Sequence, residues 1–355
     1  MAKVLAAMSG GVDSSVAALL LRQQGHECIG CTMKLYDNRQ ASLPSGRSCC
    51  TLEDVEDARS VAYRLGMPYY VFNFKDAFAE KVMDKFVDSY RAGLTPNPCI
   101  DFNRYMKFEK LMERARILGC QYIATGHYAR IEKQDGRWLL KKGLDEGKDQ
   151  SYMLYTMTQE QLAHTLFPLG GLRKEQVRQL AEAEGFVNAA KPDSQDICFV
   201  PDGDYAAMIE RYTGFPSPAG DFIDGSGAVL GRHRGIIRYT VGQRRGLGIS
   251  ARQPLYVCAL SAERNTVTLG PREALFRREA DAGAFHWIAG EAPAEPIHCR
   301  VKFRYHQPEQ EATVYPQGTD AVHIRFRQPQ RAVTPGQAAV AYQGDVVLGG
   351  GTVPA

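Results

Sequence analysis

The first 125 residues alternate between short apolar runs and longer segments with helical periodicity. Short apolar runs predict strands, and apolar positions that recur every three or four residues predict helices. The predicted strands are residues 3–8, 27–33, 68–73 and 121–125. The predicted helices are residues 14–24, 52–65, 76–91 and 104–118. This alternation indicates a doubly wound parallel sheet of the α/β class, whose ligand site lies at the carboxyl ends of the strands.

The pattern changes twice farther along the chain. Residues 159–185 keep a helical pattern, and after Gly214 short apolar segments alternate with glycine turns. From Arg277 onward, alternating segments such as 298–305 and 321–326 predict a further small β domain, which we expect to be a barrel. We therefore expect three domains: an α/β domain with a helical extension at 1–212, a central β-rich domain at 213–274 and a C-terminal β-barrel at 275–355.

Length and composition are those of a globular protein with more than one core. The chain has 355 residues, of which 44% are hydrophobic. No apolar run approaches the roughly 18 residues that a membrane-spanning helix needs. The N-terminus enters a predicted strand at once, without the charged and apolar regions of a signal peptide. These features predict a cytoplasmic protein that does not contact a membrane.

Positive charge is concentrated in the last third of the chain. The formal net charge is only +3, but residues 227–355 contain fifteen Arg and one Lys against ten Asp and Glu. Arginine binds phosphates and bases well, so this segment could form a surface for a polyanion. A general arginine preference of the coding sequence explains the same excess, and charge alone does not separate the two explanations.

The nine cysteines are scattered and odd in number, which indicates reduced thiols rather than a disulfide framework. Cys28 and Cys31 have CxxC spacing but lie in a predicted strand, where residues three apart face opposite sides and cannot share one metal ion. For the adjacent pair at 49–50, which follows a Pro/Gly/Ser loop, we expect a surface or packing role. Cys99 and Cys198 remain as candidates for chemistry.

Residues 9–15 read SGGVDSS between the first predicted strand and the first predicted helix. The two glycines let backbone N–H groups close on an anion, and the positive end of the helix points at the same place, so we expect a nucleotide phosphate site. The loop lacks the lysine of GxxxxGK[ST]. Ser9, Ser14 and Ser15 can add hydroxyl donors, and Asp13 can hold Mg²⁺ against a pyrophosphate. The alternative is a plain strand-to-helix turn with Asp13 or Ser14 as N-cap.

Two cysteines lie in rigid, polar loops. Pro96 and Pro98 predict an extended segment that cannot begin a helix before Cys99, which presents this thiol at the edge of the ligand face. Cys198 lies in the acidic, proline-bounded loop AKPDSQDICFVPDGDY. Either cysteine alone would more often be an inert buried thiol. Together with a nucleotide site they indicate sulfur chemistry.

The SGGVDSS loop resembles the pyrophosphatase loop of N-type ATP pyrophosphatases, which cleave ATP between the α and β phosphates and adenylate a carbonyl oxygen. Nearly the whole chain is similar to the tRNA-specific 2-thiouridylase family, whose members thiolate wobble uridine. The motifs that carry this resemblance occur in the family's order and are MSGGVDSSVAALLL, SCCTLEDVEDARSVA, TPNPC, NRYMKF, IATGHYAR, GKDQSYMLY, KPDSQDICF, YTVGQRRGLGI and VKFRYHQ.

The resemblance implies a reaction and its partners. ATP with Mg²⁺ would activate the uracil carbonyl oxygen as an adenylate, a cysteine persulfide would supply sulfur to carbon 2, and a second cysteine would help to release it. The implied partners are a tRNA with a wobble uridine and a persulfide sulfur donor, either a cysteine desulfurase or a relay protein. The implied catalytic domain is residues 1–212.

The resemblance also implies roles for individual residues. The ATP-binding residues would be Ala7, Met8, Ser9, Gly10, Gly11, Val12, Asp13, Ser14, Met33 and Gly126, the last two of which would bracket the adenine and ribose. The residues that meet the target base of the tRNA would be Asn97, Pro98 and Cys99. The other residues that contact tRNA would be Lys148, Asp149, Gln150, Arg304 and Tyr305. Cys198 matches the persulfide-bearing cysteine, so the implied catalytic residues are Cys198, Cys99 and Asp13, with no resident metal.

One position departs from the family pattern. Members usually have a cysteine immediately before the asparagine that matches Asn103, and this chain has Phe102 there. Phenylalanine cannot attack, resolve a disulfide or bind a metal. Either Cys99 takes over the role, which we favour, or the protein uses Cys198 alone or is impaired. An iron–sulfur cluster on Cys99, Cys198 and a third ligand is a further, less favoured alternative.

Purely structural roles could explain single motifs, and other functions could explain the chain as a whole. GKDQSYMLY could be a helix start capped by Asp149, and KFRYH could be one amphipathic strand. A different ATP pyrophosphatase, such as argininosuccinate synthase or a glutamine-dependent amidotransferase partner, would use the same loop without these cysteines. A noncatalytic RNA-binding module would need no SGGVDSS. The combination of motifs favours the thiolating enzyme.

Overall fold

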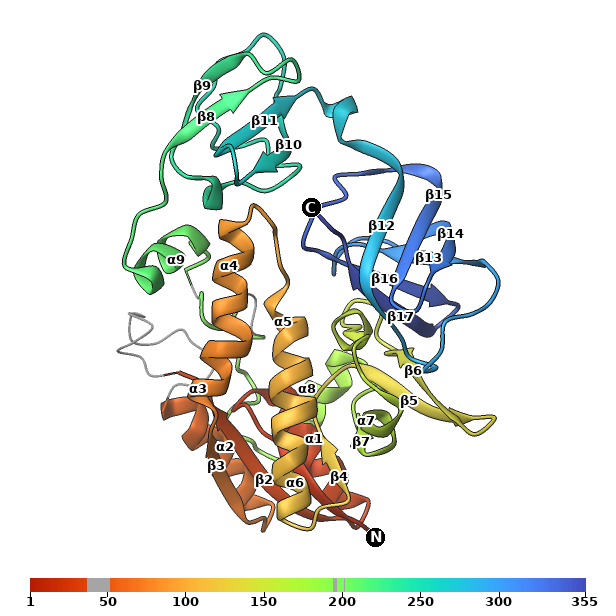
Figure 1. Cartoon of the computed structure of the whole chain (residues 1–355). Coiled ribbons are helices and arrows are strands. Elements are labelled where there is room, and N and C mark those ends of the chain that lie inside the picture. The colour runs from red at the N-terminus through yellow and green to blue at the C-terminus, as the bar shows by residue number, and fades with distance from the viewer. Residues whose placement is uncertain (37–51, 194–196, 201) are drawn as a thin grey trace.

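The fold begins with a five-stranded parallel sheet (Figure 1). A computed structural model describes residues 1–36, 52–193, 197–200 and 202–355, so the cysteine pair at 49–50 lies outside the described residues. The strand order is β3-β2-β1-β4-β7. The strands are β1 (Lys3–Ala7), β2 (Glu27–Lys34), β3 (Tyr69–Asn73), β4 (Tyr122–Ala124) and β7 (Thr165–Leu166). The predicted α/β class and parallel sheet are confirmed.

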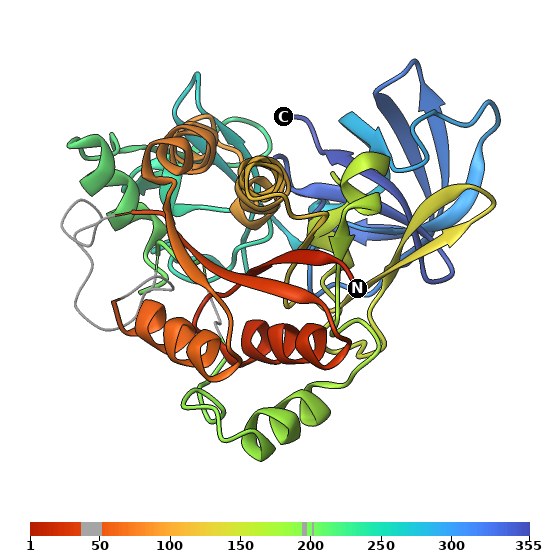
Figure 2. The ribbon, with the colours of Figure 1, turned by 90° about the horizontal axis from the view of Figure 1, so that it is seen from below.

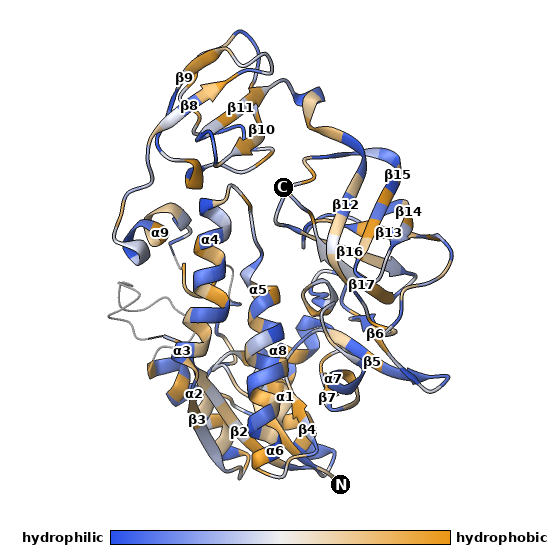
Figure 3. Ribbon diagram, in the orientation of Figure 1, coloured by the Kyte–Doolittle hydropathy of each residue, from blue (hydrophilic) through white to orange (hydrophobic). Residues whose placement is uncertain are grey.

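Helices cover both faces of this sheet, as Figure 2 shows. One face carries α1 (Val12–Gln23), α2 (Leu52–Arg64) and α8 (Lys174–Ala183). The other face carries two long helices, each with a π-helical stretch in its middle. The first consists of α3 (Lys75–Phe78), the π-helical stretch Ala79–Asp84 and α4 (Lys85–Arg91). The second consists of α5 (Pro98–Asp101), the π-helical stretch Phe102–Lys110 and α6 (Leu111–Ile117). Hydrophobic and hydrophilic bands alternate along these helices because each buries one side (Figure 3).

A short edge strand interrupts the segment for which the pattern predicts only helix. Residues 159–185 form α7 (Gln159–Ala163), then β7 beside β4, and then α8. The prediction of a continuous helical pattern is therefore wrong between the two helices. A strand of two residues is too short to give an alternating pattern that could be recognised in the sequence.

The start of the helix near Cys99 also differs from the prediction. The helix begins at Pro98, six residues before the predicted start at 104 and inside the segment predicted to be extended, with Asn97 as N-cap. Proline is tolerated at the first helical position because its missing N–H has no partner there. The Asn97 Oδ1 accepts a hydrogen bond from the Cys99 N–H at 3.1 Å, which fixes Cys99 in the first turn.

Two β domains follow. The central sheet has the order β10-β11-β8-β9, and the last six strands close into an antiparallel barrel because β12 pairs with both β15 and β17. The central strands are β8 (Gly220–Ile223), β9 (Val229–His233), β10 (Tyr256–Ser261) and β11 (Thr266–Gly270). The barrel strands are β12 (Phe276–Trp287), β13 (Ile297–Lys302), β14 (Gln310–Gln317), β15 (Ala321–Arg331), β16 (Ala338–Gln343) and β17 (Val346–Thr352). The predicted barrel is confirmed, while the domain limits at 212 and 274 stay a prediction.

Shorter helices connect these parts. They are α9 (Tyr205–Thr213) and the 3₁₀ turns Ser151–Leu154, Ile236–Arg238 and Arg272–Leu275. None of the helices within the described ranges is both long and apolar enough to cross a membrane.

A hairpin from the N-terminal part extends the barrel sheet. The strands β5 (Ala129–Gln134) and β6 (Arg137–Lys142) follow β4 directly, and β6 pairs with β17. The Arg130 guanidinium donates to Asp345 Oδ2 at 2.6 Å across this junction. This hairpin therefore joins the N-terminal part to the barrel by strand pairing, in addition to the connection along the chain.

Apolar side chains are also buried between the N-terminal part and each of the two β domains. One hydrophobic cluster contains Phe86 of α4 together with Phe222 and Val257 of the central sheet. A second contains Phe108 together with Val340 of the barrel. The three parts therefore stabilise one another, because separating them would expose apolar surface.

A buried tyrosine links the N-terminal part to the barrel and allows a stability test. The fully buried Tyr152 donates its hydroxyl to the carbonyl oxygens of Phe303 at 3.1 Å and Ala338 at 2.9 Å. Tyr152→Phe should lower the free energy of unfolding by about 1–3 kcal/mol, because two buried carbonyl groups lose their donor. Urea-induced unfolding of the full chain measures the change. Tyr63→Phe is the matched control, since Tyr63 is 87% exposed; equal midpoints for the two variants would contradict the prediction.

Candidate functional site

The turn after β1 leaves the start of α1 open to a ligand. The N-cap is Gly11, and no side chain caps the helix, so the alternative in which Asp13 or Ser14 serves as N-cap is wrong. The Ser14 hydroxyl instead donates to the Gly11 carbonyl at 3.0 Å and accepts from the Ser9 N–H at 3.1 Å. The N–H groups of the first turn and the positive end of the helix are thus arranged as in anion sites.

Two neighbours hold this loop in place. Gly10 has a φ of +79°, and a Cβ atom there would lie 2.3 Å from the Asp54 carbonyl oxygen at the start of α2. On the other side, the buried Asn188 donates its amide to the Gly10 carbonyl and to the Ser15 hydroxyl, both at 2.9 Å. Gly10 is therefore required both for its backbone conformation and for close packing.

Met33 and Gly126 lie at the carboxyl ends of β2 and β4, the two strands that flank β1. A Cβ atom on Gly126 would lie 2.9 Å from backbone atoms of Asp13 and Ser14, so this glycine lets the end of β4 pack against the first turn of α1. Met33 lies near the end of β2 and is partly buried. Their expected role at the adenine and ribose stays a prediction.

The Asp13 carboxylate is bound by two side chains from distant parts of the chain. The ammonium of Lys174, the first residue of α8, contacts Asp13 Oδ1 at 2.7 Å and Oδ2 at 2.8 Å. The Tyr128 hydroxyl donates to Asp13 Oδ1 at 2.7 Å, and burial and the Asp13 charge raise the pKa of Tyr128 above its usual range. A buried lysine thus lies at a phosphate loop whose own sequence lacks one.

Asp193 connects this lysine to a residue that we expect to touch tRNA. Its Oδ1 accepts from Lys174 at 2.7 Å and from Arg178 at 3.0 Å, and its Oδ2 accepts from Lys148 at 2.8 Å. Burial alone would raise the pKa of the Asp193 carboxyl, but hydrogen bonds from Lys148 and Lys174 lower it overall. Asp193 is therefore ionised at neutral pH and shared by three cations.

His127, in the ATGHYAR segment, is held in its neutral form. Burial and the neighbouring Lys107 ammonium lower its pKa well below the usual value. Nε2 therefore accepts from Lys107 at 3.1 Å, and Nδ1 donates to the Thr125 hydroxyl at 2.7 Å. The Lys107 ammonium also lies 4.9 Å from the centre of the Phe102 ring.

The other residues expected to touch tRNA make contacts within the protein. Asp149 accepts from the Gly143 N–H at 3.0 Å and from the Ser151 hydroxyl at 2.8 Å, and Gln150 Oε1 accepts from the Tyr128 N–H at 3.0 Å. Asp149 also accepts from the Ser151 N–H at 3.2 Å, but the N-cap of the 3₁₀ turn is Gln150, so the alternative in which Asp149 caps a helix start is wrong. Contacts of these side chains with RNA stay a prediction.

Arg304 and Tyr305 differ in their surroundings. The Arg304 guanidinium joins the central domain to the barrel, because it donates to the Val241 carbonyl at 3.2 Å and to the Thr334 hydroxyl at 2.8 Å. Tyr305 and Asp149 line one cavity of about 540 Å³. Burial, followed by the charges of Asp149 and Cys99, raises the pKa of Tyr305 to about 12.

The segment around Cys198 packs against an aromatic cluster that includes Phe102. The Tyr36 hydroxyl donates to the Cys198 carbonyl at 3.0 Å. The centroid of the Phe78 ring lies 6.0 Å from that of the Phe102 ring and 5.6 Å from that of the Phe199 ring. The residue that replaces the family's usual cysteine therefore lies in the same cluster as the residue after Cys198.

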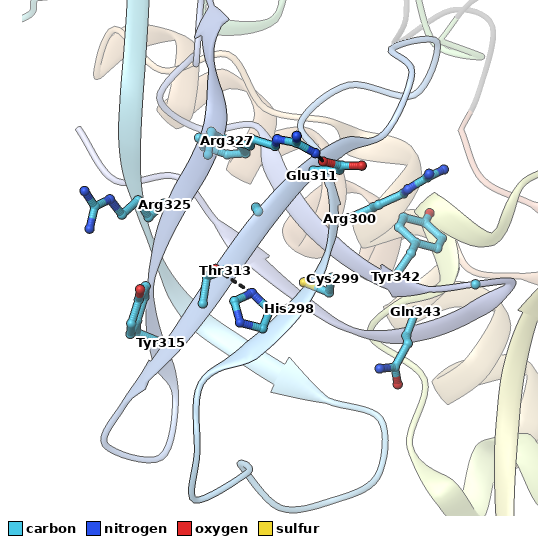
Figure 4. Close-up of a pocket in the computed structure, with 13 residues that line it drawn as sticks. His298, Cys299, Arg300, Glu311, Thr313, Tyr315, Arg325, Arg327, Tyr342 and Gln343 are labelled. Atoms are coloured by element: carbon cyan, nitrogen blue, oxygen red, sulfur yellow. Dashed lines mark hydrogen bonds and ion pairs between the residues drawn. The ribbon is translucent and has the colours of Figure 1, made fainter.

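The outer face of the barrel carries a cavity of about 830 Å³, bordered by β13, β14 and β15 (Figure 4). Arg300, Arg325 and Arg327 line it, and Arg327 pairs with Glu311 at 2.6 Å. This face contains part of the arginine excess of the last third of the chain. It is a basic hollow that fits a phosphate backbone better than a neutral ligand.

Within the ranges that the structure describes, no group of three His, Cys, Asp or Glu side chains is arranged to hold a metal ion. The iron–sulfur alternative therefore has no third ligand among these residues.

Sequence reasoning missed Lys174, Tyr128, Asn188 and Asp193. Tyr128 and Asp193 lie inside motifs shared with the family, which gave a signal but no role. Lys174 and Asn188 lie outside those motifs, and only the fold brings them to the loop, more than 160 residues from their partners.

The packing around Gly10 yields a test of the loop. Gly10→Ala should abolish ATP binding and destabilise the protein by about 1–3 kcal/mol, because the new methyl group meets the α2 backbone at an unfavourable φ. Gly25→Ala is the matched control, since Gly25 has a φ of +81° but open space around its Cβ position. Calorimetric titration with ATP measures binding. Wild-type affinity in Gly10→Ala would contradict the assignment of the loop.

Three family models match successive parts of the chain. They are the tRNA methyl transferase HUP domain at residues 2–202, the tRNA methyl transferase PRC-barrel domain at 207–271 and the aminomethyltransferase beta-barrel domain at 277–353. The first alone covers more than half of the chain.

Curated relatives match the chain over its full length. The tRNA-specific 2-thiouridylase MnmA of Symbiobacterium thermophilum is 51% identical, over 99% of this chain and 92% of that protein. The proteins of the same name from Clostridioides difficile and Acetivibrio thermocellus are 48% and 50% identical, over 99% of this chain and 98% and 99% of those proteins. The domain models carry methyltransferase names, but full-length identity of this size decides the family. The chain belongs to the family of tRNA-specific 2-thiouridylases.

Proposed function

We propose that this protein transfers persulfide sulfur to carbon 2 of the wobble uridine of tRNA, through an adenylated uridine, to give 2-thiouridine. One observation carries the proposal: about half of the residues are identical to those of tRNA-specific 2-thiouridylases over 99% of the chain. The protein would act in the cytoplasm with ATP and Mg²⁺, on sulfur from a cysteine desulfurase or a relay protein.

The loop at the start of α1 fits the ATP phosphates. It offers the N–H groups of a helix start that no side chain caps and the hydroxyl of Ser9, while Gly10 and Asn188 keep the loop in position. Mg²⁺ bound by Asp13 would neutralise the pyrophosphate as it leaves. The uracil carbonyl oxygen attacks the α-phosphorus, because this oxygen leaves carbon 2 readily only once it is part of AMP.

Sulfur then replaces that oxygen. The terminal sulfur of the Cys198 persulfide attacks carbon 2, and AMP leaves with the oxygen. The Cys99 thiolate attacks the Cys198 sulfur, so the S–S bond breaks and its electron pair stays with the sulfur on the base. The two cysteines are left as a disulfide, which a thiol of the sulfur-donor system reduces.

Two observations support Cys99 as the second cysteine. It lies three residues before Phe102, and side chains three apart lie on the same face of a helix. Its helix also meets the barrel, because Asn97 and Ile100 line one cavity together with Gly336 and Ala338. The aromatic contacts of Phe102 favour a second candidate, an impaired tRNA-binding homologue, because a phenylalanine ring occupies the usual thiol position.

The cavities of the barrel support a path for the tRNA. The Tyr305 cavity and the arginine-lined cavity share Arg300, so they form neighbouring parts of one surface. Phosphates along this surface would set the position of the tRNA, while residues 97–99 and 148–150 would meet the exposed wobble base and its loop.

Substitution of the two cysteines tests the proposal. Cys198→Ser should abolish persulfide formation and thiolation, whereas Cys99→Ser should load sulfur on Cys198 but stall its transfer. Mass spectrometry after incubation with a cysteine desulfurase and cysteine detects the persulfide, and nucleoside analysis of the tRNA detects 2-thiouridine. Cys258→Ser on β10 is the control and should behave as wild type.

Two outcomes would contradict parts of this assignment. Thiolation by Cys198→Ser would exclude Cys198 as the persulfide carrier. Thiolation by Cys99→Ser at the wild-type rate would exclude the substitute role of Cys99. In that case a large gain from Phe102→Cys would mean that the natural chain lacks one of the two cysteines.

A further inference from the structure

The ion pairs around Lys174 form a chain from the phosphate loop to the protein surface. Lys174 lies between Asp13 and Asp193, and its side chain is only 10% exposed. Lys148, at the other end, has a side chain that is 41% exposed. Arg178 contributes the remaining cation on Asp193. The Lys148 and Lys174 ammonium groups thus share one carboxylate.

The position of Lys174 conflicts with the use of Asp13. Both carboxylate oxygens of Asp13 accept from the Lys174 ammonium, and Oδ1 also accepts from Tyr128. Asp13 cannot hold Mg²⁺ against the ATP phosphates while its charge is neutralised by the Lys174 ammonium. The ammonium must therefore leave Asp13 when the nucleotide binds, and it can do so while keeping its contact with Asp193.

Asp193 responds to the position of Lys148. If an RNA phosphate draws the Lys148 ammonium away, Asp193 loses one of its cations and attracts Lys174 more strongly. The pKa of Asp193 is already lowered by its hydrogen bonds from Lys148 and Lys174, so its charge is present throughout. Movement of an exposed side chain is thereby passed to the buried ammonium.

We propose that Lys174 controls access to Asp13 and that Asp193 is the positioning residue through which tRNA contact at Lys148 moves it. The tRNA contact then draws the ammonium from Asp13 toward Asp193 and toward the phosphates of the incoming ATP. There the ammonium supplies the positive charge that a GxxxxGK[ST] loop carries in its own sequence. This inference rests on the proposed function and adds the coupling between its two substrates.

Binding of α,β-methylene-ATP, whose α–β bridge cannot be cleaved, tests the coupling without turnover. Calorimetric titrations are made with and without saturating unmodified tRNA that has a wobble uridine. In the wild type we expect tRNA to tighten binding of the analogue by about 5–150-fold, the usual range of coupling between sites. Pyrophosphate release from ATP is measured under the same two conditions.

Lys148→Met and Asp193→Asn should both abolish the effect of tRNA on binding of the analogue, the first at high affinity and the second at low affinity. Lys148→Met should bind the analogue without tRNA nearly as tightly as the wild type does with tRNA. Asp193→Asn should bind it weakly in both conditions, because Lys174 stays on Asp13. Lys110→Met, which removes an exposed pair with Glu113 on α6, is the control and should keep wild-type coupling within about twofold.

The outcomes separate this inference from the function on which it rests. If Lys148→Met binds the analogue without tRNA at the wild-type affinity, Lys148 does not influence the position of Lys174 and the proposed coupling is wrong. Lys148 lies at the surface, so this result decides the matter even if Asp193→Asn fails to fold. If the wild type releases no pyrophosphate with any wobble-uridine tRNA, the proposed function itself fails.

Discussion

The buried ammonium of Lys174 between Asp13 and Asp193 is the contact on which the arrangement of the site depends. A charge with an exposed fraction of only 10% is tolerated only when it is paired, so this ammonium holds the start of α8 against Asp13 in the first turn of α1 and against Asp193. This explains how a loop without a lysine can have one nearby. It also links the phosphate loop to Lys148 through one network of charges.

A second constraint keeps the cysteine segment and the barrel in register. The Thr95 N–H donates to the Pro335 carbonyl at 2.9 Å, and Gln337 donates its amide to the Thr95 carbonyl at 2.7 Å. Because Thr95 lies just before the helix that carries Cys99, these two hydrogen bonds join that helix to the barrel. In the proposed reaction, this link would let the basic surface of the barrel direct a single base toward the thiol.

The sequence predicted those features that depend on neighbouring residues. The β1 strand, the SGGVDSS turn and α1 follow from apolar pattern and glycine chemistry within 23 residues, and the structure has them. It could not predict the position of Lys174, because a lysine at an exposed helix start and one buried against Asp13 look alike in sequence. It also could not predict that β5 and β6 leave the α/β part to pair with β17, since strand pairing over 200 residues has no local pattern.

The most direct test of the account counts two products of the same reaction. Purified protein is incubated with ATP, Mg²⁺, a cysteine desulfurase with cysteine, and unmodified tRNA that has a wobble uridine, and both AMP and 2-thiouridine are measured over time. The account predicts one AMP for each 2-thiouridine formed and neither product when tRNA is left out. Thiolation without ATP, or steady AMP formation without thiolated nucleoside, would contradict it.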